Sequence, residues 1–165
     1  MDRCECLGDK MNKLLKFTMC LAAATLPQVF TLGFINDAQA LVNRSDLNGL
    51  LLAHPSNGKV YWIDEGKRRW IAGPNVFALL FPGRQTQQYI DVELIEEASP
   101  LTMENRVVLC KENGHRLNNK VYLLDQGTKR WVAGPKAFER NFVLKAVTAI
   151  SCPALVSIPD GRPIK

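Results

Sequence analysis

The chain has 165 residues, 47% hydrophobic and 22% charged, which is the composition of a globular protein of one domain or two small ones. Its formal net charge is +5, and this favours an acidic partner such as an anionic polymer or a membrane surface. Lys and Arg form no dense stripe, so the charge pattern excludes a typical nucleic-acid-binding protein.

Residues 1–40 are predicted to be a signal peptide. A short basic stretch begins at Met11, which is a candidate for the true start, and an apolar run and a small-x-small cleavage site at 38–40 follow. The alternative is an uncleaved membrane anchor, because the apolar run is about long enough to span a bilayer. Pro27 and the cleavage site favour cleavage. We therefore expect a secreted or periplasmic protein with no stable membrane span after cleavage.

Export changes the interpretation of the cysteines. Cys4, Cys6 and Cys20 would leave with the signal peptide, and Cys110 and Cys152 would remain. Two cysteines in an oxidising compartment predict one disulfide, Cys110–Cys152. The alternative is two buried free thiols. The mature chain has no CxxC motif, so a thiol-redox role has no support.

A duplicated stretch dominates the remaining sequence. Residues 59–81 (KVYWIDEGKRRWIAGPNVFALLF) and 120–142 (KVYLLDQGTKRWVAGPKAFERNF) agree at 12 positions when they are aligned at an offset of 61. Background composition gives about one or two matches. The sequence therefore predicts an internal repeat.

Each copy is predicted to be a strand, a turn, a strand and a short helix. In the first copy, Lys59–Ile63 and Arg69–Ile71 have the composition of strands, and Gly66 supplies the positive φ of the hairpin loop. Pro74 suits the first position of a helix. Alternation along the first strand places Tyr61 on one face and Trp62 on the other.

The predicted fold class is α+β, with two tandem units packed as one small domain. The boundaries are a lead-in at 41–47, a first repeat at 48–104 and a second repeat at 105–165 that ends in a closing strand, the start of a third copy. Each unit has an extra strand before its hairpin. One unit alone is too small to bury a good core, so we expect the two sheets to pack together or share an edge, with the helices outside.

The shared pattern V-Y-[LW]-[IL]-D-x-G-x-[KR]-R-W-[IV]-A-G-P-x-x-F, followed by a terminal I-P-D-G, resembles a short repeat of secreted bacterial proteins. This repeat often accompanies cell-wall hydrolases and other envelope proteins. The resemblance covers most of residues 48–165. It implies a non-catalytic module that binds the cell wall or a polysaccharide.

Six recurrent residues are the ligand-binding candidates. Aromatic rings can stack on sugars, and guanidinium groups can bind carboxylates or phosphates. The alternative for the tryptophans is packing in the core. For the arginines it is a pair with the aspartate of their own hairpin, or stacking on the aromatics of their own sheet. The candidates are Tyr61, Arg69, Trp70, Tyr122, Arg130 and Trp131.

The sequence carries no recognised catalytic motif. We expect no enzyme, no cofactor and no metal site, with His54 and His115 as exposed loop residues. The predicted function is an exported binding module for an envelope polymer, either peptidoglycan or an anionic polysaccharide. The alternative is a protein-interaction or structural role with an envelope protein. No nucleic acid is expected as partner, and a homo-oligomer is left open.

Overall fold

Two β-hairpins with the same turn form the centre of the structure, a computed structural model that describes residues 40–165. The first joins β2 (Val60–Asp64) to β3 (Lys67–Ile71), and the second joins β7 (Val121–Asp125) to β8 (Thr128–Trp131). Both turn residues of each hairpin have positive φ, 53° and 76° in the first and 49° and 73° in the second. Such turns match the twist of the strands. The predicted hairpins and their glycines are confirmed.

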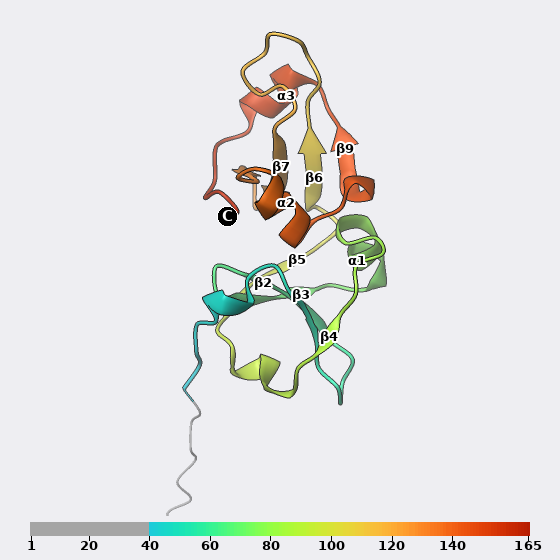
Figure 1. The fold of residues 1–165 in the computed structure, drawn as a ribbon, viewed down its shortest axis with the longest axis vertical. Helices are drawn as coiled ribbons and strands as arrows, with labels where there is room; N and C mark the ends of the chain where they lie inside the picture. Colours follow the sequence, from blue (N-terminus) through green and yellow to red (C-terminus); the bar gives the residue numbers. More distant parts are fainter. Residues whose placement is uncertain (1–39) are drawn as a thin grey trace, which may run out of the picture. The chain divides into compact units, whose positions relative to one another are not determined.

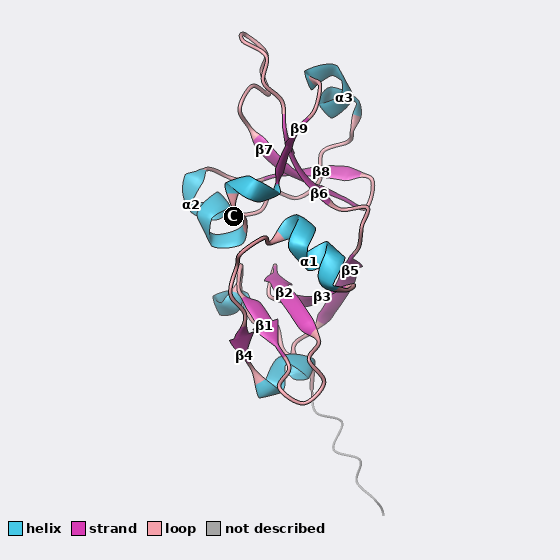
Figure 2. Cartoon of the chain, turned by 90° about the vertical axis from the view of Figure 1, so that its right-hand side faces the viewer, coloured by secondary structure: helices cyan, strands magenta, loops and turns pink. Residues whose placement is uncertain are grey.

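The first sheet contains five strands in the order β4-β1-β2-β3-β5 (Figures 1 and 2). β1 (Leu51–Ala53) pairs antiparallel with β2, and β4 (Gln87–Gln88) and β5 (Glu97–Leu101) add parallel edges. The 3₁₀ helices η1 (Ser45–Leu47) and η2 (Ile90–Leu94) lie in the connecting segments.

The second sheet has the order β8-β7-β6-β9, with β6 (Arg106–Leu109) antiparallel to β7 and parallel to β9 (Val147–Ala149). The expected closing strand lies beside β8 as two isolated parallel bridges, Lys129–Asp160 and Val132–Ile164. β5 has the corresponding place beside β3 in the first sheet. The segment that was expected to start a third copy therefore extends the second sheet.

Helices α1 (Pro74–Leu80) and α2 (Pro135–Asn141) lie between the two sheets (Figures 1 and 2). Both begin at the predicted proline. The expectation that they lie outside is wrong, because their apolar residues enter a central core that both sheets share. In that core Phe81 and Phe142 stack at 5.9 Å and both rings contact Trp62, whose indole N–H donates to Asn141 of α2.

The outer face of each sheet has a smaller core of its own. Tyr61 and Ile63 pack with Val92 of η2 and with Ile95, which follows η2. Trp62 belongs to the central core, so the predicted placement of Tyr61 and Trp62 on opposite faces is confirmed. On the second sheet, Tyr122 packs under a loop and α3 (Cys152–Ser157). The 3₁₀ helix η3 (Leu144–Ala146) precedes β9.

Arg84, in the loop after α1, links the two halves. Its guanidinium donates to the carbonyls of Glu139 and Arg140 at the end of α2, and to the carbonyl of Gly49. A cation is favourable at the C-terminus of a helix, where carbonyls lack partners. Gly49 has a φ of +85°, and a Cβ there would lie 2.5 Å from the Arg140 side chain.

Candidate functional site

Two tryptophans lie at the same place in their hairpins. Trp70 pairs across the strands with Tyr61, and Trp131 pairs with Tyr122. Both tyrosines are buried, whereas Trp70 is 39% exposed and Trp131 43%. Of the four aromatic candidates, only the tryptophans therefore present a large surface to a ligand. Each of them borders a hollow on the outer surface.

The hollow beside Trp70 has a volume of about 430 Å³ and contains both signs of charge. Its wall is formed by Lys59, Tyr61, Arg68, Trp70, Glu93 and Glu97. Arg68 donates to Glu97 Oε2 at 2.9 Å and to the Glu93 carbonyl at 2.6 Å, and its guanidinium lies over the Tyr61 ring. Burial, followed by the charge of Glu93, raises the pKa of Tyr61, so its phenol remains protonated at neutral pH.

The hollow beside Trp131 is mostly apolar. It has a volume of about 370 Å³, and beside the Trp131 indole its polar side chains are Asn119 and Lys120. Phe138 of α2 and Leu144 of η3 are part of the wall, and Leu144 is 78% exposed. Two tryptophans at corresponding positions thus have very different surroundings.

The candidate arginines are buried between the two halves, where they line a hollow of about 250 Å³. Arg69 is 3% exposed and Arg130 7%. Arg69 binds both carboxylate oxygens of Asp125 in the other half, at 2.6 and 2.8 Å. Arg130 binds both oxygens of Asp64 in return, at 2.5 and 3.1 Å. Within one hairpin, the corresponding distances are 3.4 Å for Arg69–Asp64 and 3.2 Å for Arg130–Asp125.

This reciprocal ion-pair cluster has its remaining donors satisfied by the protein. The Nε of Arg69 donates to the Ser99 carbonyl, and Asn105 adds a bond to Asp125. Burial alone would raise the pKa of Asp125, but Arg69 and Arg130 lower it below the usual value. The arginines thus hold the two halves together mainly through the aspartate of the opposite hairpin. The alternative expectation, a pair within one hairpin, is met only at the longer distances, and Arg69 also lies over the Trp62 ring.

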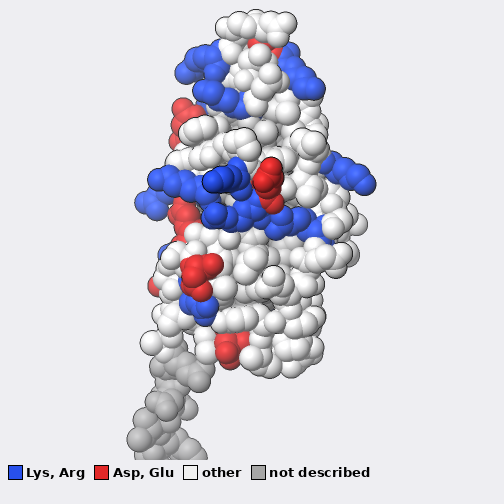
Figure 3. All heavy atoms as spheres, viewed as in Figure 1, with Lys and Arg blue, Asp and Glu red and all other residues white. Residues whose placement is uncertain are grey.

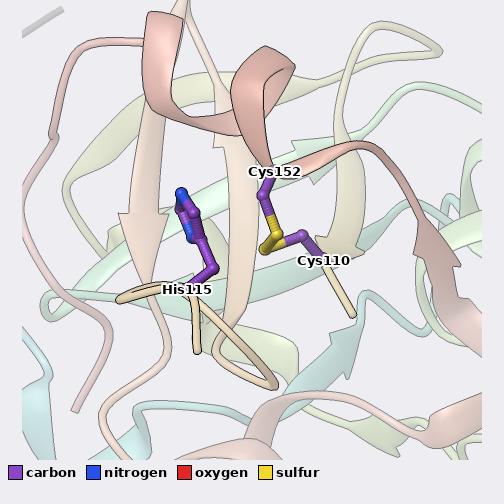
Figure 4. Close-up of side chains that lie close together, drawn as sticks. All are labelled: Cys110, His115 and Cys152. Atoms are coloured by element: carbon purple, nitrogen blue, oxygen red, sulfur yellow. A yellow bond between two sulfur atoms is a disulfide. The ribbon is translucent and has the colours of Figure 1, made fainter. Parts of the chain in front are cut away.

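Cys110 and Cys152 form a disulfide that joins the end of β6 to the start of α3. His115 lies beside it (Figure 4). Within residues 40–165, these three side chains are the one group whose ligand atoms lie close enough for a metal, within 4.8 Å of one another. Both sulfurs are consumed by the disulfide, and thiolates rather than disulfides are metal ligands. His115 also accepts a hydrogen bond from the Leu117 amide through Nδ1.

Sequence reasoning missed most of the residues around Trp70. Arg68 could have been found, because a two-residue turn pairs it with Ile63, on the face that carries Tyr61. Glu93 and Glu97 come from η2 and β5, about thirty residues further along the chain. Nothing in their local pattern indicates that they return to this hairpin.

The predicted signal peptide, apart from its last residue, Ala40, lies outside the described residues. In the part that the structure describes, we find no helix with the length and apolarity that crossing a membrane requires. No protein family, curated protein or solved structure matches this chain.

Proposed function

We propose that this is an exported, non-catalytic protein that binds an envelope polymer through the hollow beside Trp70. The exposed indole in a wall of hydrogen-bonding groups is the observation that carries this proposal. We also infer that the two halves are copies of one hairpin-and-helix unit. The matching sequence windows and the matching hairpin registers support this inference.

Trp70 suits the apolar face of a sugar ring. An indole offers a large, rigid contact area, and the edge of the same hollow supplies groups that can bind sugar hydroxyls. Lys59 is exposed, and Glu97 keeps more than half of its side chain in solvent although it pairs with Arg68. The combination of one stacking ring and peripheral polar groups is typical of ligand recognition by a rigid sheet.

The mixture of charges favours peptidoglycan over a purely anionic polysaccharide. Peptidoglycan carries sugars, carboxylates and amines in one repeating unit, whereas a polyanion would meet the carboxylates of Glu93 and Glu97 in this hollow. Both acids already have structural partners: Glu97 pairs with Arg68, and Glu93 accepts a hydrogen bond from Asn57. This supports binding rather than hydrolysis.

Co-sedimentation with insoluble peptidoglycan tests the proposal. We expect saturable binding of the full-length chain and at least tenfold weaker binding of Trp70→Ala. Trp131→Ala is the matched control, because it removes an equally exposed indole at the corresponding position and should retain binding. Binding that survives Trp70→Ala but not Trp131→Ala would refute the assignment, and release of soluble sugar ends would refute the non-catalytic part.

A further inference from the structure

The two halves differ sharply in charge. Residues 105–165 contain eleven Lys and Arg against four Asp and Glu, a net charge of +7. Residues 41–104 contain six against eight, a net charge of −2. Figure 3 shows that Lys and Arg side chains gather in a band across one face, over α2 and the C-terminal end. The protein therefore has one basic half.

One lysine of this half lines the apolar hollow beside Trp131, and two more directly follow wall residues in the chain. Lys120 forms part of its wall, and Lys136 and Lys145 directly follow the wall residues Pro135 and Leu144 in the chain. All three are exposed, and no ion pair within residues 40–165 involves them. We call Trp131, Phe138, Leu144 and these three lysines the basic apolar patch.

We propose that the basic apolar patch docks on an anionic lipid surface. Tryptophan is favoured at the boundary between headgroups and acyl chains, where its ring is amphipathic. Leu144, more exposed than any other large apolar residue described, can enter the acyl region, while lysines with flexible stems reach phosphate groups. The arrangement is that of a peripheral contact in which apolar burial and charge attraction act together.

The composition of the patch argues against a sugar or an acidic protein as its main occupant. A sugar would find few hydrogen-bonding side chains in this hollow: Asn119, Lys120 and the indole N–H of Trp131 itself. An acidic protein would form ion pairs at fixed positions, which long exposed lysine side chains on three separate segments do not provide. A fluid layer of anionic headgroups adapts to all three. This proposal uses Trp131, and it stands independently of polymer binding at Trp70.

Vesicle binding of the full-length chain tests the proposal. We use vesicles of phosphatidylglycerol mixed with phosphatidylcholine, and vesicles of phosphatidylcholine alone. Lipids brominated along the acyl chain report local insertion, because they quench a nearby indole. We expect the mixed vesicles to quench the emission that is lost in Trp131→Phe, and the neutral vesicles to leave it unchanged. This readout is specific to Trp131, so binding by residues 1–39 does not imitate it.

The variants separate charge from apolar contact. Each exposed lysine near an anionic surface contributes about a fivefold gain in affinity. The triple change Lys120→Gln, Lys136→Gln and Lys145→Gln should therefore raise the lipid concentration that half-quenches Trp131 by about a hundredfold. Leu144→Ser should reduce quenching of Trp131, and its high exposure makes it safe for folding. Trp70→Ala should leave the quenching of Trp131 by vesicles intact and should lose binding to peptidoglycan. Equal quenching of Trp131 by neutral vesicles would overturn the proposal, and so would unchanged quenching in the triple lysine variant. Protection of Trp131 by an acidic protein, but not by vesicles, would overturn it as well.

Discussion

The two hairpins make matching contacts on their inner sides but have different surroundings on their outer sides. On the inner side, Arg69 and Arg130 make the same contacts with each other's half, and Asp64 and Asp125 accept them in the same way. On the outer side, Trp70 lies among charges of both signs and Trp131 among apolar side chains and lysines. The same residue at the same strand position therefore has different surroundings in the two halves.

The reciprocal contacts explain why the inner residues match. Replacement of one member would leave a buried partner without its counter-charge, which is costly in a medium that hydrates charges poorly. No such constraint acts on the outer surface, where each half is covered by its own segments.

The largest effect is expected from breaking the ion-pair cluster. Asp125→Ala should lower the free energy of unfolding by about 3–5 kcal/mol, because it leaves Arg69 buried without a bidentate partner. Asp64→Ala should have the same effect through Arg130. The control is Asp46→Ala, which removes an ion pair with Arg44 at 2.7 Å on the surface and should have little effect. Urea unfolding measures all three, and a small loss for Asp125→Ala would contradict the account.

Removal of the disulfide should affect one half more than the other. Cys110 and Cys152 close a loop with a sequence separation of 42, and the double change to Ala should lower the free energy of unfolding by about 3–4 kcal/mol. Hydrogen exchange should show faster opening of α3 and the loop beneath it. Equal acceleration in β1 and β4 would show that the halves do not respond separately.

The pH dependence of stability should follow Asp125. Its pKa is lower in the folded protein, so its contribution is present above the unfolded value of about 3.9 and is lost as the pH falls through the lower folded value. Asp125→Asn should flatten the fall in unfolding free energy between about pH 4 and pH 2. An unchanged slope in urea titrations over that range would assign acid sensitivity to other carboxylates.

The smallest effect on stability is expected from the outer tryptophans. Trp70→Ala and Trp131→Ala should each cost about 1 kcal/mol or less, since both rings keep a large exposed fraction. Trp62→Ala should cost about 3–5 kcal/mol, because that ring is buried between Phe81 and Phe142. Thermal unfolding of the three variants ranks their losses of stability. A large loss for Trp70→Ala would show that the Trp70 ring contributes to the core.

Local features could be predicted from the sequence, and contacts between the halves could not. Turn glycines, helix-starting prolines and strand alternation act over a few residues, so the hairpins, α1 and the two faces of β2 followed from Gly66, Pro74 and Trp62. The pairing of Arg69 and Arg130 with the aspartate of the opposite hairpin depends on how the halves face each other. Local spacing pointed to Asp64 as the partner of Arg69. That contact is present at 3.4 Å, but it is longer than the contact of Arg69 with Asp125 at 2.6 Å.

One NMR measurement tests the central claim, that the two outer tryptophans serve different ligands. The chain contains three tryptophans, so 5-fluorotryptophan labelling gives three ¹⁹F resonances, which single Trp→Phe variants assign. Soluble peptidoglycan fragments should shift the resonance of Trp70, anionic bicelles that of Trp131, and neither ligand that of the buried Trp62. Fragments that shift Trp131 and leave Trp70 unchanged, or one ligand that shifts both equally, would contradict the account.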